Sequence, residues 1–254
     1  MEKADKSKNE SKDANKGERI AKRMARAGLC SRREAERWID NGRVEVNGNV
    51  LTSAACVVTN DDKILVDGKA LAGGEKTRLF LYHKPAGLLT TNKDDQGRDT
   101  IFDKLPKELP RVVTVGRLDM NTEGLLLLTN DGELSRYLEL PQNGVERTYR
   151  VRAHGHVSQN KLDQLKKGVR YKNIRYSSIK ATLEKQQGDN AWITMSLKEG
   201  KNREVRNIVE YLGMEVNRLI RISYGSFHLG NLPKGSVMEI KYGDIKKHIP
   251  QFFK

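Results

Sequence analysis

The sequence predicts an α+β protein with two domains: a small N-terminal module with two helices and a hairpin, then a larger domain. The larger domain should hold a mainly antiparallel, twisted sheet with flanking helices. Residues 18–41 have helical apolar spacing, whereas alternating, strand-like segments outnumber helical ones from residue 78 onward. These strand-like segments follow one another both directly and across helices, as in α+β proteins. We expect the domains to cover residues 17–76 and 77–254, joined by the glycine-containing stretch 69–77.

Composition points to a globular chain with a polar N-terminal tail. Of 254 residues, 37% are hydrophobic and 31% charged. Residues 1–16 have mixed charge and no apolar signal core, so we expect a disordered tail and a cytoplasmic protein. The longest apolar run is far too short to span a membrane. Cys30 and Cys56 are too far apart for a Cys-x-x-Cys metal site, and we expect them to pack as free thiols.

The net charge narrows the class of binding partner. The formal charge is +14 and the pI is about 9.7. A protein this basic usually meets a polyanion, and RNA or DNA is the leading candidate. Anionic lipid is a weaker one, because no predicted helix combines a basic face with a wide leucine or aromatic face.

The N-terminal module begins with two helices. Residues 18–27 form the first, which Gly28 ends, and Ser31 is a good N-cap for a second helix over residues 32–41. Asn47-Gly48 within VEVNGNVLT then predicts a hairpin. The two helices carry an unusual number of arginines, namely Arg19, Arg23, Arg26, Arg32, Arg33 and Arg37.

These arginines could simply form a solvated helix face. Eight basic residues against four acidic ones between Glu18 and Arg43 favour phosphate contact instead. The run AKRMARAGLCSRREAERWIDNGRVEVNG resembles the small RNA-binding module of the αL type that is named after a small-subunit ribosomal protein (the "S-four" domain). The resemblance implies binding of structured RNA, mainly through shape and backbone charge.

The larger domain is expected to alternate between strands and short helices. Strands are predicted at 78–84, 111–115, 124–130, 148–153, 191–197, 216–225 and 237–242. Helices are predicted within 131–140, from the Ser158 cap to Gly168, and over 202–213. In the last helix, Val205, Ile208, Val209 and Leu212 form the core stripe, so Arg203, Arg206 and Glu210 lie on the other side.

Several cofactor and nucleophile motifs are absent from the sequence. There is no Gly-x-Gly fingerprint for a dinucleotide, and Asn231 stands where a P-loop starting at Gly225 would need lysine. Gly-x-Ser-x-Gly and His-Glu-x-x-His are also missing. These absences exclude a nucleotide-dependent helicase or GTPase, and they leave ordinary side chains to perform any chemistry.

The run TVGRLDMNTEGLLLLTNDG (114–132) places an arginine and a carboxylate at the entrance to an apolar strand. One interpretation is structural, with Asp119 capping a turn and Arg117 pairing with it. The other is chemical, because a lone carboxylate acts as nucleophile or general base when an arginine keeps it ionised and aimed.

Five segments together resemble the successive motifs of the pseudouridine synthases. They are HKPAGLLTTNKDDQGRDTIFDKLP, VGRLDMNTEGLLLLTNDGEL, VERTYRV, LKEGKNREVRNIVEYLG and RLIRISYG. The similarity is to the ribosomal RNA branch of the family. His83-Lys84-Pro85 and Arg203-Glu204-Val205-Arg206 are most like its large-subunit members.

The resemblance assigns roles to individual residues. It implies that Asp119 is the catalytic aspartate, acting as nucleophile or as base, and that Arg117 fills the gap left by a flipped uridine. Tyr149 would stack on the uracil and assist proton removal from carbon 5. Arg206 would pair bidentately with Asp119, lowering its pKa and fixing its rotamer, and Leu219 would line an apolar pocket.

Simpler interpretations of three of these motifs remain open at this level. Tyr149 shares a strand face with Val151 and could be ordinary core. Arg206 could be a surface helix arginine, and Lys84-Pro85-x-Gly87 is expected to be a rigid turn and not a catalytic group.

The resemblance therefore implies a cofactor-independent isomerase that converts a specific uridine of large-subunit ribosomal RNA to pseudouridine. We expect it to need no metal, to act as a monomer away from membranes, and to bind ribosomal RNA, free or in a pre-ribosomal particle. A non-catalytic RNA-binding or ribosome-assembly factor with the same fold is the alternative.

Overall fold

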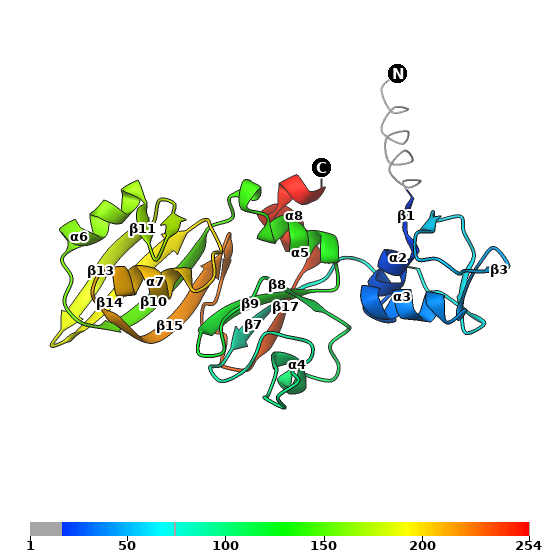
Figure 1. Ribbon diagram of the computed structural model, residues 1–254, viewed down its shortest axis with the longest axis horizontal. Coiled ribbons are helices and arrows are strands. Elements are labelled where there is room, and N and C mark those ends of the chain that lie inside the picture. The colour runs from blue at the N-terminus through cyan, green and yellow to red at the C-terminus, as the bar shows by residue number, and fades with distance from the viewer. Residues whose placement is uncertain (1–16, 74, 254) are drawn as a thin grey trace, which may run out of the picture. The chain divides into compact units, whose positions relative to one another are not determined.

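The computed structural model describes residues 17–73 and 75–253, and the chain forms two compact units, Met1–Lys76 and Thr77–Lys254 (Figure 1). The predicted disordered tail, residues 1–16, lies outside the described residues. Each unit has its own hydrophobic core.

The first unit is a helical pair beside short strands. Its elements are β1 (Glu18–Arg19), α2 (Ile20–Arg26), α3 (Arg32–Asp40), β2 (Val44–Val46), β3 (Asn49–Val50), β4 (Val57–Val58), β5 (Ile64–Val66) and β6 (Lys69–Ala70). Ser31 and Glu34 form a capping box at the start of α3, which confirms the predicted N-cap. Asn47 and Gly48 both have positive φ, as a tight β2–β3 turn requires.

Two predictions for this unit were wrong in detail. Glu18 and Arg19 are not helical, because they pair with Val58 and Val57 of β4. The expected linker at 69–77 begins with β6, which pairs with β5. Both errors concern strands of two residues, whose pairing depends on partners distant in sequence.

The second unit is built on one nine-stranded sheet. The strands are β7 (Leu79–Lys84), β8 (Val113–Val115), β9 (Glu123–Thr129), β10 (Arg147–His154), β13 (Lys180–Gln187), β14 (Asn190–Leu197), β15 (Glu215–Tyr224), β16 (Phe227–His228) and β17 (Val237–Ile240). Their order is β13-β14-β10-β15-β9-β7-β17, with β16 on β15 and β8 on β9. Every pair in this sheet is antiparallel except β9–β15, which confirms the predicted α+β class with a mainly antiparallel sheet.

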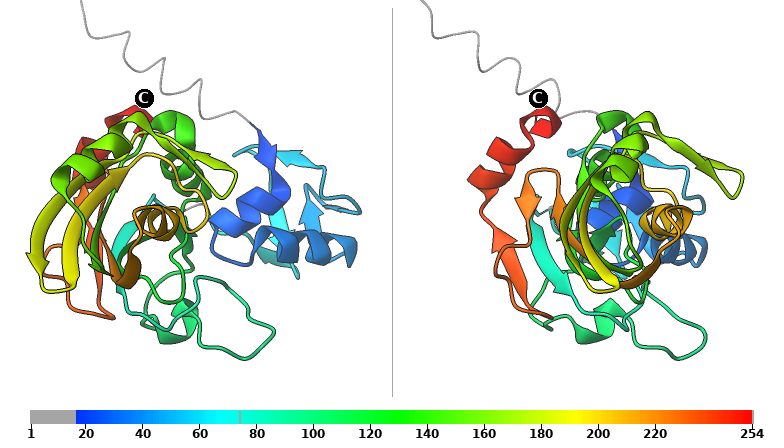
Figure 2. Two further views of the ribbon diagram at one scale, coloured as in Figure 1. Left: turned by 60° about the vertical axis from the view of Figure 1, so that its left-hand side comes forward. Right: turned by 90° about the vertical axis from the view of Figure 1, so that its left-hand side faces the viewer.

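One half of this sheet, from β13 to β15, curves around a helix. Alternate residues of its strands face a core that α6 (Gln159–Asp163), the 3-10 helix η2 (Gln164–Lys167) and α7 (Glu204–Tyr211) cover. Figure 2 shows α7 on the concave side of this curved half. A separate hairpin, β11 (Val169–Tyr171) and β12 (Ile174–Tyr176), also packs against this core.

The other half of the sheet is covered on both faces. β9 is fully buried along its length. Leu125 and Leu127 face α5 (Gly132–Glu139) and α8 (Tyr242–His248), while Leu126 and Leu128 face α4 (Ile101–Lys104). The four leucines therefore serve two cores, which explains why the run LLLL shows no alternation.

The halves join where β9 meets β15, at a position that only glycine can fill. Gly124 has φ +105°, and a Cβ there would lie 2.3 Å from the carbonyl oxygen of Arg221. Because this close approach aligns Glu123 with Ile220, Gly124 fixes the register of the one parallel pair in the sheet.

Sequence periodicity misplaced or missed several elements of this unit. The single helix expected from Ser158 to Gly168 is α6 followed by η2. The hairpin β11–β12, strand β13 and helix α8 were not predicted. The strand expected over 237–242 ends at Ile240, after which α8 begins.

Candidate active site

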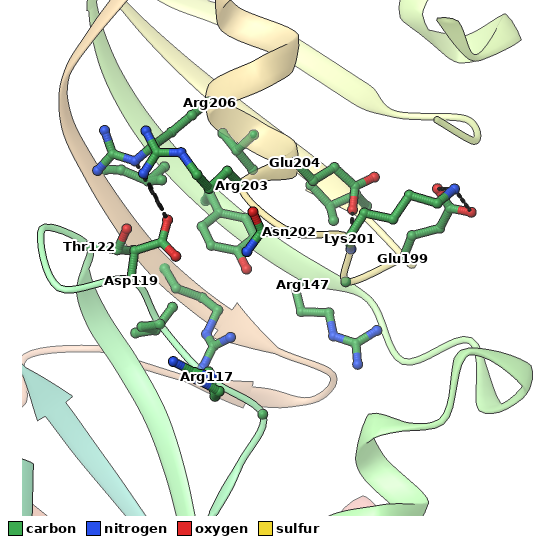
Figure 3. A pocket seen from close by; sticks show the side chains of 18 of the residues that line it. Arg117, Asp119, Thr122, Arg147, Glu199, Lys201, Asn202, Arg203, Glu204 and Arg206 are labelled. Atoms are coloured by element: carbon green, nitrogen blue, oxygen red, sulfur yellow. Dashed lines mark hydrogen bonds and ion pairs between the residues drawn. The ribbon is translucent and has the colours of Figure 1, made fainter. Parts of the chain in front are cut away.

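A pocket of about 470 Å³ opens in the second unit where its two half-sheets meet. Its walls come from the β8–β9 loop, strands β10 and β15, and the segment leading into α7. Figure 3 shows Asp119 at one end of this pocket, facing Arg203 and Arg206, and a second group of charged side chains at the other end. The structure thus brings residues from four distant segments around one cavity.

The carboxylate of Asp119 accepts no hydrogen bond from the described residues. Its backbone carbonyl accepts the N–H of Thr122, which closes the turn. Among the described residues, no hydrogen bond to its carboxylate oxygens is found, and the side chain is 37% exposed. The side chain is therefore not the turn cap of the structural interpretation, and Arg117, which is exposed on the pocket wall, forms no ion pair with it there.

Two arginines approach this carboxylate. Arg206 Nε lies 3.8 Å and Arg203 Nη1 lies 3.9 Å from Asp119 Oδ2. The expected pairing of Arg206 with Asp119 is thus present as an ion pair, but both distances exceed hydrogen-bond length, so the pairing is not bidentate in this structure. Arg203 was not expected near the carboxylate; it reaches it from the position before α7, where its φ is +50°.

Arg206 is held by burial as well as by charge. Its side chain is only 16% exposed, which rules out a surface helix arginine. Nη2 donates to the Asn121 carbonyl at 3.1 Å, while buried Nε has no hydrogen-bond partner. Burial and neighbouring Arg203 lower the pKa of Arg206, and Asp119 offsets part of this shift. The free Nε donor, 3.8 Å from Asp119 Oδ2, is available to a charge that develops in the pocket.

Tyr149 and Leu219 supply the apolar part of the pocket. Tyr149 lies on β10 beside Met195 and Arg221, and Leu219 lies on β15. Tyr149 packs partly against two of the three hydrophobic clusters of the unit and also lines the cavity. Tyr149 therefore belongs both to the core and to the pocket wall, and its contact with uracil stays a prediction.

The Asp119 loop is fastened by a buried lysine. Lys84 is fully buried, and its Nζ donates to the carbonyls of Pro85, Met120 and Thr122 at 2.9–3.1 Å. Gly87 N–H donates to the Met120 carbonyl at 2.8 Å. Burial lowers the pKa of Lys84 to about 8. The expected rigid turn at residues 84–87 is thus a clamp for the loop that carries Asp119.

A second anchor lies four residues after Asp119. Glu123 accepts two hydrogen bonds from Arg218, at 2.8 and 3.0 Å, and pairs with Lys234 at 2.7 Å. Hydrogen bonds from Arg218 and Lys234 hold the pKa of Glu123 near 2. Sequence analysis did not single out Glu123, because nothing in the sequence brings Arg218 and Lys234 together.

The far end of the pocket contains an unusual carboxyl group. Glu204 is buried; its Oε2 accepts the Lys201 N–H at 3.0 Å, and its Oε1 has no partner. Burial raises the pKa of Glu204 to about 7. Arg147, also buried, donates to several backbone carbonyls and to the Tyr224 hydroxyl at 2.7 Å. Both residues lie within the family motif segments, but nothing in the sequence indicates that they are buried beside the pocket.

Comparison with known proteins fixes the family. The family model described as RNA pseudouridylate synthase matches residues 78–211, and the S4 domain model matches residues 18–64. The chain belongs to the RNA pseudouridine synthases. An RNA pseudouridine synthase of Rickettsia felis is 46% identical over 91% of this chain and 100% of its own length.

Other relatives agree with this assignment. The ribosomal large subunit pseudouridine synthase B of Yersinia pestis is 45% identical over 86% of this chain and 70% of its own length. A crystal structure of a pseudouridylate synthase matches with a TM-score of 0.64 and 26% identity, covering 90% of this chain and 98% of that one. The resemblance seen in the sequence is thereby confirmed, and the enzyme is a cofactor-independent isomerase of RNA. No helix in the described part of the chain is long and apolar enough to cross a membrane.

The arginines of the S4 domain form a separate set from those of the pocket. Within the described residues, five of the six predicted to bind RNA have no ion pair: Arg19, Arg26, Arg32, Arg33 and Arg37. All but Arg26 are exposed. Arg23 differs, because its Nη1 donates to Asn60 at 2.7 Å and lies 3.4 Å from Glu18. Its first role is therefore to join α2 to the loop after β4.

Proposed function

We propose that this synthase converts a specific uridine of large-subunit ribosomal RNA to pseudouridine, with Asp119 as the single catalytic carboxylate. The observation that carries the proposal is an unbonded carboxylate beside two arginines in a pocket lined by Tyr149 and Leu219. The name of the Yersinia pestis relative supports the large-subunit target. We place the reaction in the cytoplasm and assign it to a monomer, since residues of one unit surround the pocket.

The uridine must leave the RNA stack to enter such a pocket, because its reacting atoms are otherwise covered. Arg117, exposed at the pocket edge, fills the space that the flipped base vacates. The uracil then stacks on Tyr149 and contacts Leu219. Arg19, Arg26, Arg32, Arg33 and Arg37 hold the RNA by its phosphates, and Arg23 contributes mainly through α2.

The chemistry exchanges one glycosidic bond for another. The bond from ribose carbon 1′ to N1 breaks, the ring turns, and carbon 1′ bonds to carbon 5. The carbon 5 proton leaves, assisted by Tyr149, and N1 ends protonated. Asp119 starts this sequence as nucleophile at the sugar or as base. Arg206, with Arg203 beside it, attracts the negative charge of the carboxylate and holds it in position.

Mapping pseudouridine in ribosomal RNA tests this function. RNA from a strain lacking the protein should lose the modification at a large-subunit position, and the wild-type gene should restore it. A loss confined to small-subunit RNA would overturn the target. Unchanged modification, with altered ribosome assembly, would support the alternative of a non-catalytic assembly factor.

A further inference from the structure

The hairpin β11–β12 has one apolar face and one basic face. Val169 pairs with Tyr176, Arg170 with Arg175, and Tyr171 with Ile174. Tyr176 is buried, and Val169 and Tyr171 pack against the core under α7. Arg170 and Arg175 are exposed, and because side chains alternate along strands, they share the opposite face. Figure 2 shows this yellow-green hairpin projecting from the rest of its unit.

The two arginines oppose each other without compensation. Like charges directly across an antiparallel pair destabilise it. Among the described residues, neither Arg170 nor Arg175 has a side-chain hydrogen bond or an ion pair. Lys172, in the turn between them, donates to both carboxylate oxygens of Glu210, at 2.7 and 2.8 Å, so its charge is compensated. The Arg170–Arg175 pair costs stability, whereas the neighbouring Lys172 is neutralised by Glu210. The uncompensated arginine pair therefore points to a role outside folding.

The hairpin is fastened to the rim of the active-site pocket. Lys201 Nζ donates to the Arg175 carbonyl at 2.6 Å, and Ser177 donates to Glu199 at 2.8 and 3.0 Å. Both Lys201 and Glu199 line the pocket. Asn207 of α7 donates to the Tyr176 hydroxyl at 2.9 Å. The basic face of the hairpin is therefore held at a fixed position relative to the helix that carries Arg206.

We propose that the β11–β12 hairpin is a phosphate-binding ribbon for the RNA strand that leaves the pocket. Arg170 and Arg175 contact the backbone beside the flipped nucleotide, and the phosphate charge between them removes their mutual repulsion. Guanidinium groups suit this role because they bind phosphate through paired hydrogen bonds. This inference rests on the proposed function, since it takes the substrate to be an RNA strand with one nucleotide turned into the pocket.

The first test removes both charges, as Arg170→Gln with Arg175→Gln. We expect KM for the target RNA to rise roughly tenfold and kcat at saturating RNA to stay unchanged, because the hairpin does not touch the reacting atoms. The slope of log affinity against log salt should become shallower by roughly 0.7–0.9 per arginine. A matched control is Arg152→Gln with Lys185→Gln, which removes equal charge from exposed positions of β10 and β13.

A second variant separates RNA binding from folding. Arg175→Glu places opposite charges across the hairpin, so the melting temperature should hold or rise. RNA affinity should nevertheless fall about as far as in the double glutamine variant, because both variants remove two positive charges from this face of the hairpin. A hairpin with only a structural role would show the same gain in stability but an unchanged RNA affinity.

Three outcomes would overturn the proposal. The double variant of Arg170 and Arg175 could keep the wild-type KM and salt slope, or it could lose kcat alone. The control variant of Arg152 and Lys185 could lose as much RNA affinity as the double variant. Wild-type turnover on the same RNA separates this proposal from the proposed function. If the wild type does not modify that RNA, the target is wrong. Filter binding of the same variants to that RNA still reports on Arg170 and Arg175.

Discussion

Helix α3 of the S4 domain and the active-site pocket use arginine in opposite ways. On the S4 domain, the arginines of α3 are exposed and form no ion pair within the described residues. Around the pocket, Arg147 and Arg221 are buried, and Arg206 is nearly so. Each of these three donates to backbone carbonyls, for example Arg221 Nε to Leu125 at 2.7 Å. Within one basic chain, arginine is therefore solvated on α3 and structural around the pocket.

This contrast shows what the exposed and the buried arginines can each contribute to RNA binding and to catalysis. A guanidinium in water binds phosphate through a screened attraction, so it adds affinity that salt removes. A guanidinium in a buried pocket interacts more strongly with nearby charges, because the effective dielectric constant is lower there, and it fixes the positions of its neighbours. We therefore expect substitutions in the S4 domain to change KM and substitutions in the pocket to change kcat.

The largest expected effect is that of Asp119→Asn. Asparagine is nearly isosteric but can neither attack the sugar nor accept a proton as a carboxylate does. Turnover should fall at least about a thousandfold, which corresponds to about 4 kcal/mol in the barrier. Release of tritium from carbon 5 of labelled uridine measures it, while a gel shift of the same RNA should be unchanged. Near-normal release would return Asp119 to a structural role.

Arg206→Met tests the pocket side of the contrast next. Methionine preserves much of the packing but leaves Asp119 with Arg203 alone. We expect kcat to fall roughly a hundredfold, as when one preorganised donor is removed from an active site, with RNA affinity changed only a few-fold. Single-turnover tritium release and filter binding separate the two quantities. A loss of affinity with normal kcat would make Arg206 a phosphate contact.

The S4 side is tested by Arg32→Gln, Arg33→Gln and Arg37→Gln together. These α3 arginines are exposed, so we expect kcat to be unchanged and KM to rise. The salt slope should become shallower by roughly 0.7–0.9 for each lost phosphate contact. Arg23→Gln is the control: it breaks contacts to Asn60 and Glu18, so it should lower stability more than it lowers the slope.

The sequence predicted much of the fold but less of the active site. Apolar periodicity and caps located the helices of the S4 domain and most long strands, because those signals are local. Hairpin β11–β12 was missed because each of its strands has only three residues, which is too short for their alternation to stand out. Strand β13, with the sequence KATLEKQQ, was missed because it is an edge strand whose side chains are mostly exposed.

The site was predictable only where family motifs name single residues. Asp119, Tyr149, Arg206 and Leu219 do surround one pocket. Arg203 was assigned to the solvent face of its helix, and only the backbone turn at that residue, with φ +50°, brings it to the carboxylate. Glu204 and Arg147 depend on burial, which follows from the packing of segments distant in sequence.

A buried charge should also make the pocket respond to pH. Because burial lowers the pKa of Lys84 to about 8, its ammonium loses a proton above that pH and the clamp on the Asp119 loop weakens. We expect kcat to fall by up to about tenfold per pH unit above 8. Stability should not fall with it: between pH 8 and 10.5 the unfolded chain binds the extra proton, so the contribution of Lys84 to stability rises. A pH–rate profile beside thermal melts checks both, and a flat kcat up to pH 9.5 would contradict it.

The smallest expected effect concerns stability and again distinguishes the two units. The folded pKa of Glu204 is about 7, above its usual 4.5, so the folded state binds more protons in that range and stability falls as pH rises from 4.5 to 7. Glu204→Gln keeps an oxygen for the Lys201 N–H and removes the buried charge. It should therefore stabilise the catalytic unit at pH 8, by at most about 3 kcal/mol, and change nothing near pH 4.5.

Urea unfolding in a Trp38→Phe background follows Trp192, the remaining tryptophan, which lies in β14 of that unit. Glu36→Gln, on the exposed face of α3, is the matched control and should give no gain at either pH. An equal gain from both variants would show that net charge, and not burial in the pocket, sets the cost of a carboxylate in this enzyme.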